Sequence, residues 1–268
     1  MSSIQRHPAE SHEATPARRN LVALGTIVRR EVARILRIWG QTLVPPAITM
    51  TLYFLIFGGL IGSRIGDMGG YSYMEFIVPG LVMMSVIQNS YGNISSSFFG
   101  AKFGRHVEEL LVSPMPNWVI LWGYVAGAVL RGLMVGAIVL MIAMCFTSVR
   151  IPHPLVTLTT VLLGATIFSL AGFINAVYAK KFDDVAIVPT FILTPLTYLG
   201  GVFYSVKLLP AWAEAATHAN PIFYGQRLPL RPARQQRRAA TDGLRVDDRV
   251  RGRAVVAGVV VAQARCRA

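Results

Sequence analysis

The sequence predicts an all-α membrane protein, a polytopic helical bundle. Hydrophobic residues make up 53% of its 268 residues and charged residues only 15%, whereas about a quarter of an ordinary soluble domain is charged. Five stretches are apolar over the roughly 20 residues that a helix needs to cross a bilayer. Because a span in lipid must satisfy its own backbone hydrogen bonds, these stretches are expected to be helices.

The chain begins with a polar segment and an amphipathic helix. Residues 1–19 lack hydrophobic periodicity and are expected to be disordered. Between residues 21 and 39, apolar side chains recur at helical spacing and three arginines fall on the opposite face. This pattern predicts an interfacial helix with its arginines toward lipid phosphates. The apolar residues are Leu24, Val28, Val32, Ile35 and Trp39, and the arginines are Arg30, Arg34 and Arg37.

The predicted transmembrane domain covers residues 20–224. Its spans are expected at 42–61, 76–99, 118–146, 155–178 and 185–204, followed by an external connector at 205–224. With a cytoplasmic N-terminus, the cytoplasmic side holds 11 Lys and Arg and the other side 3. The positive-inside rule therefore predicts that the N-terminus is cytoplasmic.

No catalytic, cofactor-binding or metal-binding motif is recognisable. The sequence has no phosphate-binding G-x-x-x-x-G-K-[ST] loop, no H-E-x-x-H, and no credible Ser, His and Asp set. Its two cysteines form no metal-ligand spacing. The chain alone is not expected to be an enzyme.

Polar residues inside the spans are candidates for function. Arg131 lies deep in the third span, where a charge costs about 2.5 to 3.5 kcal/mol on insertion scales, so it is expected to face a cavity, a partner or a dimer interface. The alternative is that it snorkels to the nearer surface. In the second span Gln88, Asn89 and Asn93 line a translocation path or hydrogen-bond neighbouring helices. Two pairs of glycines in the third span permit close helix contact: Gly123 with Gly127, and Gly132 with Gly136.

Two segments carry a family resemblance. They are "GRHVEELLVSPMPNWVILWGYVAGAVLRGL" at 104–133 and "FDDVAIVPTFILTPLTYLGGVFYSVKLLPAWAEAATHANPIFY" at 182–224. The chain resembles, over roughly 21–224, the permease subunits of ABC-2 type ATP-binding-cassette exporters. That resemblance implies a homodimer of six-span permeases in the bacterial inner membrane, driven by separate P-loop ATPase subunits that bind the ATP.

The resemblance also assigns roles to two loops. The cytoplasmic loop at 102–117 would couple to the ATPase through a short helix, with Glu108 and Glu109 exposed and Leu110 and Leu111 available for docking after Arg105. The alternative is a solvated face between two spans. The external connector would cap the exit with short helices, or would serve only as an interfacial anchor. Its marked residues are Tyr204, Pro210, Trp212 and Pro221.

The tail at 225–268 does not fit this plan. It contains 11 Arg and no Lys, Phe, Trp or Tyr, and its longest apolar run, nine residues at 254–262, is too short to cross a membrane. A one-base shift of the reading frame after about Tyr224 would explain such a composition and the loss of the expected sixth span. The alternative is a basic extension for anionic lipid or nucleic acid. That extension would have to be cytoplasmic, and five spans leave it outside, so no nucleic-acid partner is expected.

The sequence therefore predicts the permease subunit of an ABC exporter. An ion- or proton-coupled carrier working alone is disfavoured, because Arg131 is the only charge well inside a span and no Asp, Glu or His lies at comparable depth. A non-transporting membrane scaffold is the third possibility. The substrate stays open among lipid-linked saccharide, drug and lipid.

Overall fold

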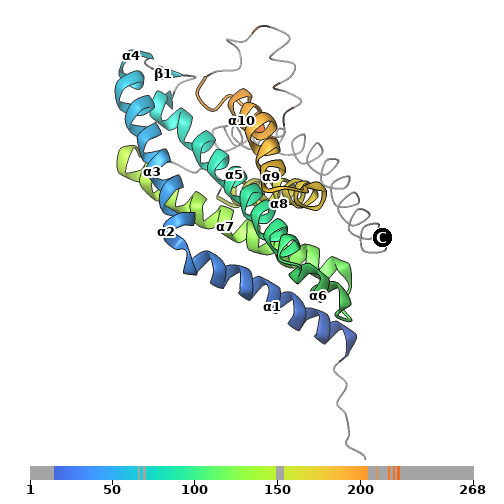
Figure 1. Ribbon diagram of the computed structural model, residues 1–268. Coiled ribbons are helices and arrows are strands. Elements are labelled where there is room, and N and C mark those ends of the chain that lie inside the picture. The colour runs from blue at the N-terminus through green and yellow to red at the C-terminus, as the bar shows by residue number, and fades with distance from the viewer. Residues whose placement is uncertain are drawn as a thin grey trace, which may run out of the picture.

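A computed structural model describes residues 15–65, 67–68, 71–148 and 154–204, together with Pro210, Thr217, Asn220, Ile222 and Phe223. These residues form a bundle of helices with one small hairpin (Figure 1). The sequence prediction of a polytopic helical bundle is confirmed. The sixth span, the tail and the change of reading frame fall outside the described residues.

The N-terminal third of the bundle consists of short and long helices in succession. Helix α1 (Pro16–Arg37) is followed by α2 (Trp39–Thr42), α3 (Val44–Tyr53), the π-helical segment η1 (Phe54–Ile61) and α4 (Gly62–Ile65). Pro45 and Pro46 stand in the first turn of α3, where a missing backbone N–H costs no helical hydrogen bond. Strands β1 (Asp67–Met68) and β2 (Tyr71–Ser72) then pair antiparallel, with Asp67 opposite Ser72.

The remaining helices supply most of the core. They are α5 (Tyr73–Phe103), α6 (His106–Val112), α7 (Asn117–Phe146), α8 (Pro154–Tyr178) and α9 (Phe182–Val188), followed by the π-helical η2 (Pro189–Leu193) and by α10 (Thr194–Leu199). Helices thus occur within all five predicted spans, although in the last of them α10 ends at Leu199, before the predicted end at residue 204. In the described part of the chain, four helical stretches are long and apolar enough to cross a membrane: Trp39–Ile61, Asn117–Phe146, Pro154–Tyr178 and Phe182–Leu199.

Helix α5 is the centre of the bundle. It packs against both α7 and α8, which also contact each other, and most of its residues are buried. Its polar run keeps it out of the set of strongly apolar helices, although it covers the predicted second span. Because neighbouring helices cover α5, its polar side chains can be satisfied by protein groups and need not meet lipid.

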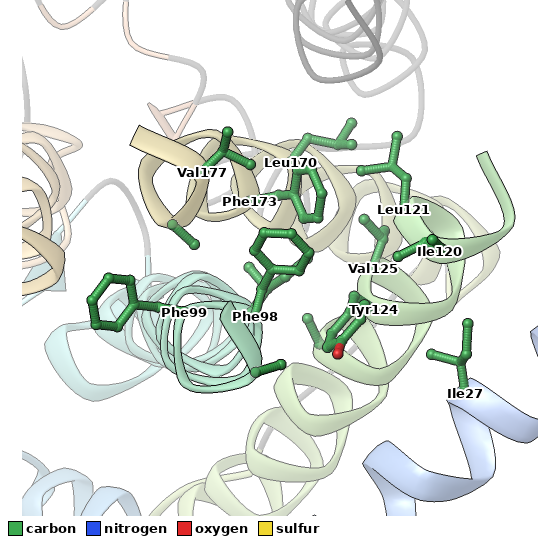
Figure 2. Close-up of a cluster of buried hydrophobic side chains, with 14 of the residues drawn as sticks. Ile27, Phe98, Phe99, Ile120, Leu121, Tyr124, Val125, Leu170, Phe173 and Val177 are labelled. Carbon is green, nitrogen blue, oxygen red and sulfur yellow. The ribbon is translucent and has the colours of Figure 1, made fainter. Parts of the chain in front are cut away.

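Aromatic packing joins α5, α7 and α8 at one end of the bundle. The ring of Phe98 lies 4.4 Å from that of Phe173 and 5.4 Å from that of Tyr124, measured between centroids. Figure 2 shows these rings converging from the three helices, with Ile27 of α1 approaching α7 from outside. Rings at such separations contribute about 0.5 to 1.5 kcal/mol beyond their buried area.

The glycine pairs of α7 mark its closest helix contacts, as the sequence predicts. A Cβ at Gly123 would lie 2.7 Å from Ile27 Cγ2, and one at Gly127 would lie 2.6 Å from the Cβ of Glu31. These two glycines therefore let α1 run along the first half of α7, in register every four residues. Gly132 and Gly136 meet α5 in the same way, at Ser90 and Val86.

The predicted cytoplasmic loops lie at the same end of the bundle. Lys102, at the end of α5, donates from Nζ to the carbonyl oxygens of Val177 and Ala179 at 2.7 and 2.8 Å. These bonds satisfy carbonyls at the end of α8, which its own helix leaves without partners. They also hold the end of α5, which leads into α6, beside the end of α8, which leads into the loop at Lys180 and Lys181.

The structure differs from the sequence prediction at the N-terminal helix. It begins at Pro16, so residues 16–19 are helical rather than disordered. It ends at Arg37, and Trp39 belongs to the four-residue α2, where its side chain is exposed. Only Ile35 of the predicted apolar face is fully buried. The buried face is formed by Ile27, Glu31 and Ile35.

Candidate functional site

The predicted coupling loop contains the expected short helix. Arg105 precedes α6 with φ 60°, a left-handed backbone that is unfavourable for a residue with a side chain, and so forms a sharp corner after α5. Glu108 and Glu109 are exposed in the first turn of α6, where the positive end of the helix dipole stabilises negative charge. The loop therefore presents an acidic face away from the bundle.

The apolar residues of α6 are divided between two faces. Leu110 and Val107 pack against the aromatic core cluster, whereas Leu111 is exposed and Val112 is 87% exposed. Leu110, which was expected to be available for docking, is half-buried against this cluster, because positions 107 and 110 share one face of the helix. Val112, rather than Leu110, lies on the outer face of α6 beside Leu111. Helical periodicity, applied to the seven residues of α6, would have found it.

The polar residues predicted in the second and third spans meet in one network. Arg131 lies half-way along α7 and donates from Nη1 to Asn93 Oδ1 at 3.3 Å. A weaker contact joins its Nη2 to Asn89 Oδ1 at 3.5 Å. Gln88 is half-buried beside Asn89 and takes no part in the network within the described residues. Arg131 therefore points toward α5 rather than toward a membrane surface.

Helix α1 contributes a buried carboxylate to this network. Glu31 is only 2% exposed and forms an ion pair with Arg34, whose Nη2 lies 2.8 Å from Glu31 Oε2. Ser97 Oγ of α5 lies 2.7 and 2.8 Å from the two carboxylate oxygens. Arg34 Nη2 also donates to Asn93 Oδ1 at 2.8 Å. Asn93 is thus the residue at which the groups from α1, α5 and α7 join.

Two sequence expectations change as a result. Arg34 was expected on the outer, lipid-facing side of its helix, but it turns inward because it lies one turn from Glu31 and can reach both Glu31 and Asn93. Glu31 was not anticipated as a site residue. Its signal in the sequence is its spacing, four residues after Ile27 and four before Ile35, which places it on the buried face.

The described part of the external connector is fastened to α10. Asn220 Nδ2 donates to the carbonyl oxygen of Leu196 at 2.6 Å, and Thr217 Oγ1 to that of Leu199 at 3.1 Å. Tyr204 OH donates to the carbonyl of Tyr198 at 3.2 Å. These bonds satisfy carbonyls near the C-terminal end of α10. Pro210 is exposed, and Trp212 and Pro221 lie outside the described residues.

The fold and these sites define a class of protein. A bundle of membrane-crossing helices, with a polar network inside it and a short exposed helix at one end, is a multi-pass membrane protein. Residues 22–228 match the model of the ABC-2 type transporter family, and the chain belongs to that family.

Relatives of this chain are bacterial membrane permeases and nodulation proteins. The inner membrane transport permease YadH of Escherichia coli (strain K12) is 61% identical over 203 residues, 76% of this chain and 79% of that protein. Nodulation protein J of Sinorhizobium fredii (strain NBRC 101917 / NGR234) is 26% identical over 184 residues, 68% of this chain and 69% of that protein. This chain is accordingly a multi-pass inner-membrane permease of the ABC transporter type.

Proposed function

We propose that this chain is the transmembrane subunit of an ABC exporter and passes its substrate outward with energy from separate ATPase subunits. ATP is bound and hydrolysed by that partner, and the permease itself carries no cofactor. The observation that supports this division most directly is α6. Its exposed Glu108, Glu109, Leu111 and Val112 form an acidic and apolar surface that fits a soluble partner.

The path from the ATPase into the membrane runs through α6. The helix is joined to α5 by the corner at Arg105 and leads directly into α7. Leu110 and Val107 anchor it on the core that α5, α7 and α8 share. A movement imposed on the outer face of α6 is therefore transmitted to the helices that hold the polar network.

The remaining parts of the proposal concern assembly and orientation. Two copies form a homodimer in the inner membrane, with the N-terminus and α6 on the cytoplasmic side. Lys102, Lys180 and Lys181 lie at the same end of the bundle as α6, which supports this orientation. Gln88, Asn89 and Asn93 line the substrate path, and the connector after α10 closes it on the outer side.

An ion-coupled carrier working alone is the second candidate. Glu31 favours it, since a buried carboxylate near Arg131 is a group that a proton-coupled carrier could use. Its pairing with Arg34 and Ser97, however, makes it a hydrogen-bonded ion pair rather than an isolated acid.

Reconstituted ATPase activity tests the proposal. The permease is co-expressed and co-purified with a P-loop ATPase partner, and ATP hydrolysis is measured in proteoliposomes. Glu108→Ala combined with Glu109→Ala is expected to reduce the stimulation by about tenfold, because the acidic contact is lost on one face of α6.

The matched control is Asp183→Ala, an exposed acidic residue in the first turn of α9. It is expected to leave the stimulation near the level of the unmodified protein. Equal loss in both variants would contradict a specific role for α6. Substrate transport that continues without any ATPase would overturn the exporter proposal and favour the carrier.

A further inference from the structure

We propose that Arg131 and Arg34 bind an anionic group, a phosphate or a carboxylate, of the molecule that this permease transports. That the bound molecule is transported rests on the proposed function, whereas the binding of the anion does not. It follows from the hydrogen bonds and charges of the network that joins α1, α5 and α7.

The network contains more donors than acceptors. Asn93 Oδ1 already accepts from both arginines, and Glu31 Oε2 accepts from Arg34 and lies within reach of Ser97. Three further buried N–H groups have no acceptor among the described residues: Nε of Arg34, Nε of Arg131 and Nδ2 of Asn93. Asn93 is completely buried, with 0% of its surface exposed. Buried donors are normally paired, so the groups missing from this site are acceptor oxygens.

The network is also positively charged. Two guanidinium groups face one carboxylate, and both guanidinium groups donate to the same oxygen of Asn93. Two like charges this close repel each other, most strongly where water is excluded. In the described residues Arg131 forms no ion pair of its own. An anion with several oxygens would supply both the charge and the acceptors that the network needs.

The position of the network suits a transported group. Arg131 lies half-way along the 30 residues of α7, and its guanidinium contacts Asn89 and Asn93 of α5. Arginine is the side chain best suited to hold a phosphate or carboxylate, because its planar N–H groups can form paired hydrogen bonds with the two oxygens. Among a lipid-linked saccharide, a drug and a lipid, the structure therefore favours a substrate with a negatively charged headgroup.

Ligand-induced thermal stabilisation tests this site. The full chain in a non-ionic detergent is titrated with phosphatidylglycerol, with inorganic phosphate, and with zwitterionic phosphatidylcholine as reference. A ligand that binds only the folded protein stabilises it by RT ln(1 + [L]/Kd), so the rise of Tm with ligand concentration reports affinity. Stabilisation by phosphatidylglycerol alone identifies an amphiphilic anion, and stabilisation by phosphate as well identifies the oxyanion itself. Either result supports the proposal.

Substitutions then decide whether Arg131 holds the anion. Arg131→Gln is expected to weaken binding by about tenfold or more, because it removes the charge and the unpaired donor. Arg131→Lys keeps the charge but loses the planar donors, so its affinity for the anion is expected to lie between those of the unmodified protein and the Arg131→Gln variant. Arg29→Gln removes an exposed charge from the outer face of α1 and serves as the control, with unchanged binding. Each shift is measured against the same variant without ligand, so altered stability does not hide the result.

Glu31→Gln separates anion binding from a purely structural role. If Glu31 only holds the helices together, its substitution cannot strengthen binding of an added anion. If it competes for Arg34, removing its charge is expected to tighten binding by about tenfold.

Three outcomes would overturn the proposal. They are no stabilisation of the unmodified protein by any anion, equal stabilisation of the Arg131→Gln variant, or a dimer that dissociates on Arg131→Gln while anions have no effect. The last would show that a carboxylate of a second copy compensates Arg131. None of them depends on α6, so ATPase stimulation through Glu108 and Glu109 stands or fails separately.

Discussion

At the scale of single residues, the close approach of α1 to α7 depends on two glycines. The side chain of Glu31 lies directly over Gly127, and Ile27 over Gly123, with no room for a Cβ at either position. This approach places the Glu31 carboxylate within reach of Ser97, and the Arg34 guanidinium within reach of Asn93, both on α5. The position of Glu31 is therefore set by the absence of a side chain on the neighbouring helix.

Gly127→Ala is expected to destabilise the protein. A methyl group there would lie 2.6 Å from Glu31 Cβ and would displace the buried ion pair, at a cost of about 1 to 3 kcal/mol for overpacking. The thermal midpoint of the purified chain is the measurement.

The control is Gly92→Ala on α5. Nothing lies within 4 Å of the position that its Cβ would take. Replacing a helical glycine by alanine in open space is expected to stabilise by up to about 1 kcal/mol. Equal midpoints in the Gly127→Ala variant and the unmodified protein would show that α1 is not held closely against α7.

The sequence predicts some of the network residues and misses others for a physical reason. Arg131, Asn89 and Asn93 are identifiable because polar groups are conspicuous in an apolar span. Glu31 and Arg34 lie on an amphipathic helix that is rich in charge, where one more charged residue carries no signal. Only the packing of α1 on α7 shows that these two residues face inward.

At the scale of elements, α5 combines a polar sequence with a buried position. The predicted pathway residues lie on it, and the structure leaves Gln88 half-buried while Val86, two residues earlier, is completely buried. The two interpretations of the polar run, a substrate path or helix packing, can therefore be separated along one helix.

Cysteine labelling distinguishes them. In a chain whose Cys145 and Cys266 are replaced by serine, Gln88→Cys is expected to react with a small, charged thiol reagent, because a substrate path must admit water. Val86→Cys on the same helix should stay unlabelled. If both positions resist labelling at the same level, the polar run serves packing, and the pathway proposal for Gln88 fails.

Short elements were harder to predict than long ones. Helices occur over all five predicted spans, because a long apolar run in lipid has one stable form. The start of α1 differs from the prediction, and Leu110 of α6 packs partly against the core. A few residues of helix are decided by which neighbours they contact, and the sequence alone does not show those neighbours.

At the scale of the whole molecule, the loops with the most positive charge lie together at one end. The Lys102 bonds to the end of α8 bring α6 and the loop at Lys180 and Lys181 to the same place. The count of Lys and Arg in the loops predicts this grouping and assigns it to the cytoplasmic side. The tail after Tyr224 and its proposed change of reading frame stay a prediction, which sequencing of the gene decides.

Photo-crosslinking from α6 tests most directly whether this permease couples to an ATPase through that end. A photoreactive amino acid replaces Val112, which is 87% exposed on α6, and in a matched protein it replaces Leu155, which is 75% exposed at the opposite end of the bundle. An adduct is expected between the P-loop ATPase and position 112, with none from position 155. An ATPase adduct from position 155, or the absence of one from position 112 in an active complex, would contradict coupling through that end.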